Sequence, residues 1–297
     1  MRFGTISAPD WKRSPGPYFI LALGWSWLFW LPIVFTGMDI AVTPGLVLFI
    51  PGIFGPAVSG ILLTCLYGDR QERREYWRRL TSFRRIGPRW CAVIISIAPC
   101  CSVLAILTGW VVQGSLPSMD TAVSYVTRPW TIIPFALATM LYGPLPEEPG
   151  WRGYALDFLQ RKWSALASSL VLGIIWAVWH LPLFFMRNSL LSEVVPLWSP
   201  QFWVSMGPGI LALAVVMTWI HNHTQRSILA AILFHFMMNF TLEFLRLPGD
   251  LKIYLFVWLT IIAIVVTVVY GPATLTGKVR RRPAGLGQKS AKRDLQT

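Results

Sequence analysis

Residues 90–119 read WCAVIISIAPCCSVLAILTGWVVQGSLPSM, thirty residues without Asp, Glu, Lys or Arg. A helix needs about 20 mainly apolar residues to cross a lipid bilayer, so this run is long enough to span one. Seven other uncharged intervals of 16 to 32 residues lie along the chain. The pattern therefore predicts an all-α polytopic membrane protein with about eight transmembrane helices.

The composition points the same way. Of 297 residues, 55% are hydrophobic and only 13% are charged, and the mean hydropathy is +0.55. Soluble domains carry about 25% charged residues, so a water-soluble globule is excluded. The apolar intervals end at residue 277, which predicts one transmembrane domain over 1–277. Residues 278–297 are basic and lack a hydrophobic period, which predicts a disordered cytoplasmic tail.

The basic residues predict the orientation. If the N-terminus is inside, 22 of the 26 Lys and Arg fall on inner segments, as the positive-inside rule requires. Both termini are therefore expected in the cytoplasm, and the cell membrane is the expected location. Residues 69–89 hold eight Arg, which would also suit a nucleic acid, but loops beside membrane helices are commonly basic. We expect contact with anionic lipid headgroups and no nucleic-acid partner.

Residues 145–160, LPEEPGWRGYALDFLQ, place paired carboxylates where the fourth apolar interval ends. A carboxylate inside the bilayer costs about 2.5 to 3.5 kcal/mol, so it needs a partner or a purpose. Glu148 and Arg152 are four residues apart and can pair on one helix face. Glu147 points about 100° away from that face, which makes it the better candidate for a base. The alternative is a charge cluster at the membrane interface.

Two further apolar intervals contain ionisable groups. His180 lies late in the fifth interval, and His235 lies in the seventh with Asn239 one helical turn on. A single histidine in an apolar helix is more often a packing residue than a ligand. Together with the acidic cluster, however, these residues predict one buried polar site, because polar groups in membranes face the bundle interior and pair. The core that carries the site is expected over about 129–246.

Other polar residues are assigned to surfaces. Asp157 and Arg161 are four residues apart and predict an exposed helix pair. His221 and His223 have H-x-H spacing at the inner end of the sixth interval. An interfacial loop is favoured there over a metal site.

Three motifs in this order resemble the CAAX protease and bacteriocin-processing family, also called Abi, which is related to the type II CAAX prenyl endopeptidases. The pattern EExxxR matches Glu147 to Arg152, FxxxH matches Trp176 to His180 with Trp in place of Phe, and HxxxN matches His235 to Asn239. The expected number of helices is also similar to the family's fold.

The resemblance implies an intramembrane endopeptidase that hydrolyses a peptide bond of a membrane-associated or prenylated, CAAX-type substrate. By analogy, Glu147 is the base that activates water and His180 holds that water or a metal. His235 and Asn239 polarise the scissile carbonyl and stabilise its oxyanion. Arg152 orients Glu148. The implied partners are membrane lipid and a membrane-associated peptide or protein.

The sequence leaves metal dependence open. Glu147, His180 and His235 are a reasonable zinc shell, yet the same residues suit a metal-free attack by water. The single-helix signature HExxH is absent. Two other functions also stay open. One is a noncatalytic family member, in bacteriocin immunity or as a membrane scaffold. The other is a proton-coupled transporter, for which internal repeats are expected and none is found.

Overall fold

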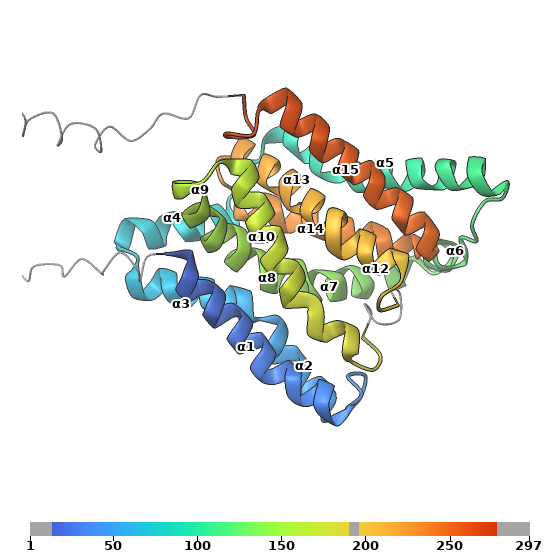
Figure 1. Cartoon of the computed structure of the whole chain (residues 1–297), viewed down its shortest axis with the longest axis horizontal. Coiled ribbons are helices and arrows are strands. Elements are labelled where there is room, and N and C mark those ends of the chain that lie inside the picture. The colour runs from blue at the N-terminus through green and yellow to red at the C-terminus, as the bar shows by residue number, and fades with distance from the viewer. Residues whose placement is uncertain (1–13, 190–195, 278–297) are drawn as a thin grey trace, which may run out of the picture.

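The fold is a bundle of helices. The computed structural model describes residues 14–189 and 196–277, and these residues contain no β-strand (Figure 1). The predicted all-α class is confirmed. The predicted tail, residues 278–297, lies outside the described residues.

The helices follow the apolar intervals. In chain order they are α1 (Pro15–Thr36), α2 (Gly45–Ile53), α3 (Gly55–Tyr67), α4 (Arg70–Thr81), η2 (Phe83–Arg85), α5 (Gly87–Gln113), α6 (Asp120–Thr127), η3 (Pro129–Thr131), α7 (Ile132–Tyr142), α8 (Pro144–Gly150), η4 (Trp151–Ala155), α9 (Leu156–Lys162), α10 (Ala165–His180), η5 (Leu181–Phe185), α12 (Pro200–Val204), η6 (Ser205–Gly209), α13 (Ile210–His223), α14 (Ile228–Leu245) and α15 (Gly249–Tyr270).

Six helices of the described chain are long and apolar enough to cross a membrane, and the bent pair α2–α3 makes up to seven. This number agrees roughly with the predicted eight. The fourth predicted span is missing from the set because it is divided between α7 and α8 at Gly143. Large apolar side chains on the outer faces are exposed, Phe35 by 81% and Val268 by 77%. Such surfaces fit contact with lipid.

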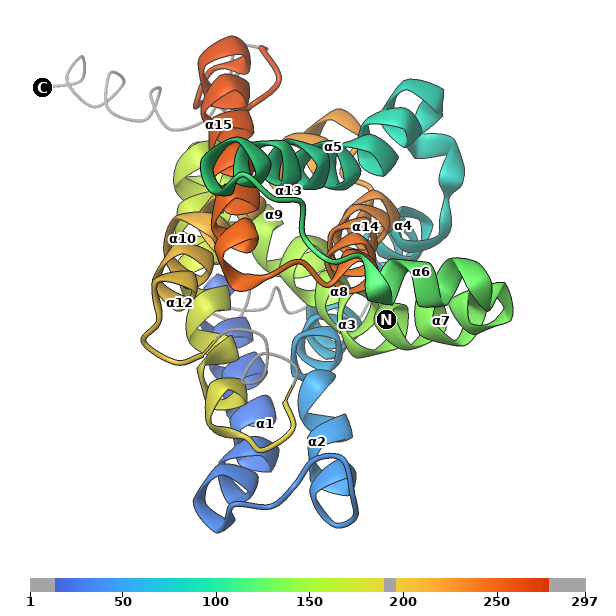
Figure 2. The same cartoon turned by 90° about the vertical axis from the view of Figure 1, so that its right-hand side faces the viewer.

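Helix α8 lies near the middle of the bundle. Helices α1 and α2 extend on one side of it and α5 and α15 lie on the other, in both views (Figures 1 and 2). It packs against α3 without side chains between the backbones, since a Cβ on Gly60 would lie 2.8 Å from the Cα of Gly150. A Cβ on Gly150 would lie 2.1 Å from the carbonyl oxygen of Pro56. Small residues thus fix α8 against α3, as is common between membrane helices.

The segment from α8 to α9 changes its helical winding. Pro144 begins α8, Pro149 lies inside it, and residues 151–155 continue as a π-helix before α9. The backbone of this segment is therefore irregular, with Pro149 inside the helix that begins at Pro144. Single π-turns within helices occur often at functional sites, because the wider turn changes the direction of the side chains.

Candidate active site

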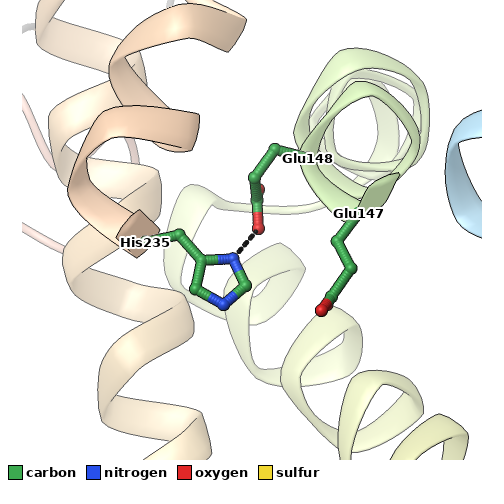
Figure 3. Close-up of side chains that lie close together, drawn as sticks. All are labelled: Glu147, Glu148 and His235. Carbon is green, nitrogen blue, oxygen red and sulfur yellow. Dashed lines mark hydrogen bonds and ion pairs between the residues drawn. The ribbon is translucent and has the colours of Figure 1, made fainter. Parts of the chain in front are cut away.

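Three ionisable side chains meet inside the bundle. Glu147 and Glu148 come from α8 and His235 comes from α14, and their ligand atoms lie within 4.8 Å of one another (Figure 3). All three residues are buried, with 4% or less of their surface exposed. The convergence that the sequence predicted for these residues is therefore present in the structure.

Glu148 is fully paired. Arg152 Nη1 donates to its two carboxylate oxygens at 2.9 and 3.0 Å, across the four-residue spacing that the sequence indicated. His235 Nδ1 lies 2.8 Å from Oε1 of the same carboxylate. An ionised carboxylate only accepts hydrogen bonds, so Nδ1 carries the proton and Nε2 is the atom left for another partner. Glu148 thus holds His235 in one orientation.

Glu147 is held differently. Its Oε2 accepts a hydrogen bond of 2.6 Å from Trp176 Nε1 on α10, and this is its one hydrogen bond to the described part of the chain. Oε1 is therefore available to another group. The two neighbouring acids thus differ. The charge of Glu148 is neutralised by an arginine, whereas Glu147 keeps one carboxylate oxygen without a partner in the described ranges.

The two remaining motif residues flank this centre. His180 ends α10, where its Nδ1 lies 2.8 Å from the carbonyl oxygen of Trp176, and the rings of these two residues are 5.7 Å apart. The Trp176 ring is also 5.3 Å from that of His235, so it lies between the two histidines. Asn239 lies one turn after His235 on α14. A Cβ on Gly143 would come within 2.8 Å of its Nδ2, so the glycine leaves space for this amide.

Arg152 is completely buried on the π-turn, and its guanidinium lies 4.5 Å from the centre of the Trp176 ring. Its Nε and Nη2 have no hydrogen-bond partner among the described residues. Buried polar groups without a partner usually bind water, and these two donors belong to the side chain that pairs with Glu148. The arrangement is suited to holding a water molecule or a polar substrate group.

The close group does not fit a zinc shell. Both oxygens of Glu148 accept from Arg152, and His235 Nδ1 is bound to Glu148. A cation coordinated there would lie beside a guanidinium of the same charge. The predicted zinc set contains His180 in place of Glu148, and it stays a prediction.

A second cluster with a buried carboxylate was not found by sequence reasoning. The predicted surface pair of Asp157 with Arg161 is wrong, because Asp157 is 8% exposed and binds Arg79 Nη1 at 2.5 Å and Arg226 Nη2 at 3.1 Å. His221 Nε2 lies 3.5 Å from its Oδ1 and is completely buried, so the loop placement of this histidine is also wrong. Burial alone would raise the pKa of Asp157, but the adjacent Arg79 and its other partners hold it well below the ordinary value.

This second cluster connects α4 to the segment from α8 to α9. Arg79 Nε donates to the carbonyl oxygen of Arg226 at 2.6 Å, and its Nη2 donates to that of Arg152 at 3.3 Å. A cavity of about 440 Å³ lies beside it, lined by residues of α3, α4 and α9. The basic loop that sequence analysis assigned to orientation therefore has a structural function as well. The only available signal in the sequence was the concentration of arginine in residues 69–89.

Comparisons with known proteins agree with the geometry. Residues 129–241 match the model of the type II CAAX prenyl endopeptidase Rce1-like family. The chain is also 27% identical over 251 residues to CAAX prenyl protease 2 of Methanococcus maripaludis. The aligned region covers 82% of this chain and 89% of that protein. The family match contains all three motifs. The resemblance that the motifs predict is confirmed, because both comparisons find this chain similar to type II CAAX prenyl endopeptidases.

Proposed function

We propose that this chain is an intramembrane endopeptidase that hydrolyses a peptide bond of a membrane-associated, prenylated CAAX-type substrate. The observation that carries the proposal is the difference between the two adjacent acids. Arg152 neutralises Glu148, whereas Oε1 of the buried Glu147 has no hydrogen-bond partner among the described residues. The name of the archaeal relative supports the substrate class.

In the proposed mechanism, a water molecule binds between Glu147 and His180. Glu147 takes one proton from the water as its oxygen forms a bond to the scissile carbonyl carbon. The carbon–nitrogen bond then breaks, and the proton passes from Glu147 to the leaving amine. A general base placed in this way contributes about 10²- to 10⁴-fold to the rate.

The oxyanion of the tetrahedral intermediate needs hydrogen-bond donors. The Asn239 amide and the Nε2–H of a protonated His235 supply them, and Glu148 stabilises that imidazolium through Nδ1. Removing one such donor typically costs about 10²- to 10³-fold in kcat. Glu148 and Arg152 therefore act on the reaction through His235.

The test is cleavage of a quenched peptide with a prenylated CAAX end by purified protein, beside the same peptide with an unmodified cysteine. Wild type should release product, while Glu147→Ala should bind the prenylated peptide and release none. Transport of the peptide without a cleaved product would contradict the proposal, as would equal absence of product from both folded proteins. A chelator arm tests the zinc prediction, since loss of turnover requires a metal and unchanged turnover supports a metal-free attack.

A further inference from the structure

Trp176 touches more of the candidate active site than any of the motif acids does. Its Nε1 donates to Glu147, its carbonyl oxygen accepts from His180, and its ring faces Arg152 and His235. The residue is 2% exposed. It occupies the position where the motif FxxxH has phenylalanine.

The replacement of Phe by Trp changes the chemistry of this position. A phenylalanine ring supplies an aromatic wall and no hydrogen-bond donor, whereas the indole adds one N–H. In this chain the N–H points at a carboxylate oxygen at 2.6 Å, and an ionised acceptor shortens and strengthens such a hydrogen bond. The substitution therefore adds a direct link from α10 to the acid of α8.

Because Glu147 is buried, the hydrogen bond from Trp176 holds its carboxylate in one orientation. Glu147 is 4% exposed and has no other hydrogen bond to the described residues, so Trp176 fixes which oxygen is occupied. Oε1 is then the oxygen available to a water molecule. Trp176 is itself held by packing, because its ring contacts both the Arg152 guanidinium and the His235 ring.

We propose that Trp176 is a positioning residue whose indole N–H holds the Glu147 carboxylate with one oxygen directed at the attacking water. This inference rests on the proposed function. It assigns to this chain a contact that a phenylalanine at the same position would not make.

The experiment compares Trp176→Phe with Trp30→Phe. Trp30 is also fully buried and also loses an indole hydrogen bond, which it makes to the carbonyl oxygen of Phe49 at 3.1 Å, away from the two acids. The free energy of one hydrogen bond to a charged group corresponds to a change of about 10- to 100-fold in a rate or equilibrium constant. Trp176→Phe should therefore lower kcat by that factor. Its KM should stay within about twofold, because the bond orients the acid and not the substrate. Trp30→Phe should keep the kcat of wild type.

Two further measurements separate positioning from packing. Replacement of Trp176 by 3-benzothienylalanine removes the N–H and keeps the ring size, so it should lower kcat as Trp176→Phe does. In protein labelled with ¹⁵N-indole, the resonance absent from Trp176→Phe should move upfield in Glu147→Ala. The inference is overturned if both replacements have the kcat of Trp30→Phe, or if that resonance does not respond to Glu147. If wild type itself shows no turnover that depends on Glu147, the proposed function fails and this inference fails with it.

Discussion

Two buried carboxylate clusters lie on one segment, at the two ends of the π-turn. At Asp157 the charge is met by two arginines and a histidine, and each of these comes from outside the segment. At Glu147 and Glu148, one arginine of the segment pairs with Glu148. One oxygen of Glu147 and two guanidinium nitrogens have no hydrogen-bond partner among the described residues. A cluster that stabilises the fold satisfies its charges, whereas a cluster suited to catalysis leaves polar atoms for a substrate and water.

The largest effect on stability is expected from Arg152→Met. The substitution leaves the Glu148 carboxylate fully buried with only His235 as a partner. Breaking a buried ion pair from one side costs about 3 to 5 kcal/mol, so the melting temperature should fall strongly. Thermal unfolding in detergent measures it, with Arg128→Met as the control because Arg128 is exposed.

The double variant Arg152→Met with Glu148→Gln sharpens this test. Removing both charges should restore part of the lost stability, because no unpaired charge remains. Equal melting temperatures for wild type and Arg152→Met would show that the pair does not stabilise the bundle.

Asp157→Asn is expected to destabilise the fold less. The amide has nearly the same shape, and Arg79 keeps its hydrogen bonds to the carbonyl oxygens of Arg226 and Arg152. Losing hydrogen bonds between charged groups costs about 1.5 to 3 kcal/mol. Chemical denaturation of the purified variant measures this loss, and no change in stability would contradict a structural function of the cluster.

The pH dependence of that loss is a separate prediction. The pKa of Asp157 is lowered in the folded protein from its ordinary 3.8, so its stabilising contribution is complete above that value and is lost as the pH falls through the lower folded pKa. The difference in unfolding free energy between wild type and Asp157→Asn should thus be constant from neutral pH to about pH 5 and shrink below about pH 4. A difference that grows in acid would contradict the sign of this shift.

Arg226→Ala should have the smallest effect. Its side chain is 50% exposed, and Asp157 keeps Arg79 and His221 as partners. Exposed ion pairs contribute about 1 kcal/mol or less, and salt screens them. The melting temperature should therefore fall slightly at low salt and not at high salt. A loss as large as that of Asp157→Asn would show that Arg226 is the main partner.

The sequence predicted side-chain pairs within one helix and missed most contacts between helices that are distant in the chain. The Glu148–Arg152 pair follows from a four-residue spacing, and the same spacing places Asn239 beside His235 along α14. The contact between Glu148 and His235 joins residues 87 apart, so only the polarity of the two intervals and the family motifs pointed to it.

Asp157 shows why local rules were insufficient. A nearby arginine on the same helix satisfied the spacing rule, but the observed partner Arg79 is 78 residues away on α4. The hydrogen bond from Trp176 to Glu147 was missed for a related reason. The direction of an indole N–H depends on a side-chain rotamer, which the spacing of residues does not define.

The most direct test of the central claim compares Glu147→Gln and Asp157→Asn, both of which remove one buried negative charge from the same segment. For each variant, turnover of the prenylated peptide per folded molecule and the melting temperature are measured in one detergent. We expect Glu147→Gln to lose at least about 100-fold in turnover and keep its melting temperature, and Asp157→Asn to lose melting temperature and keep its turnover. If Glu147→Gln keeps wild-type turnover, Glu147 is not the base and the account is contradicted.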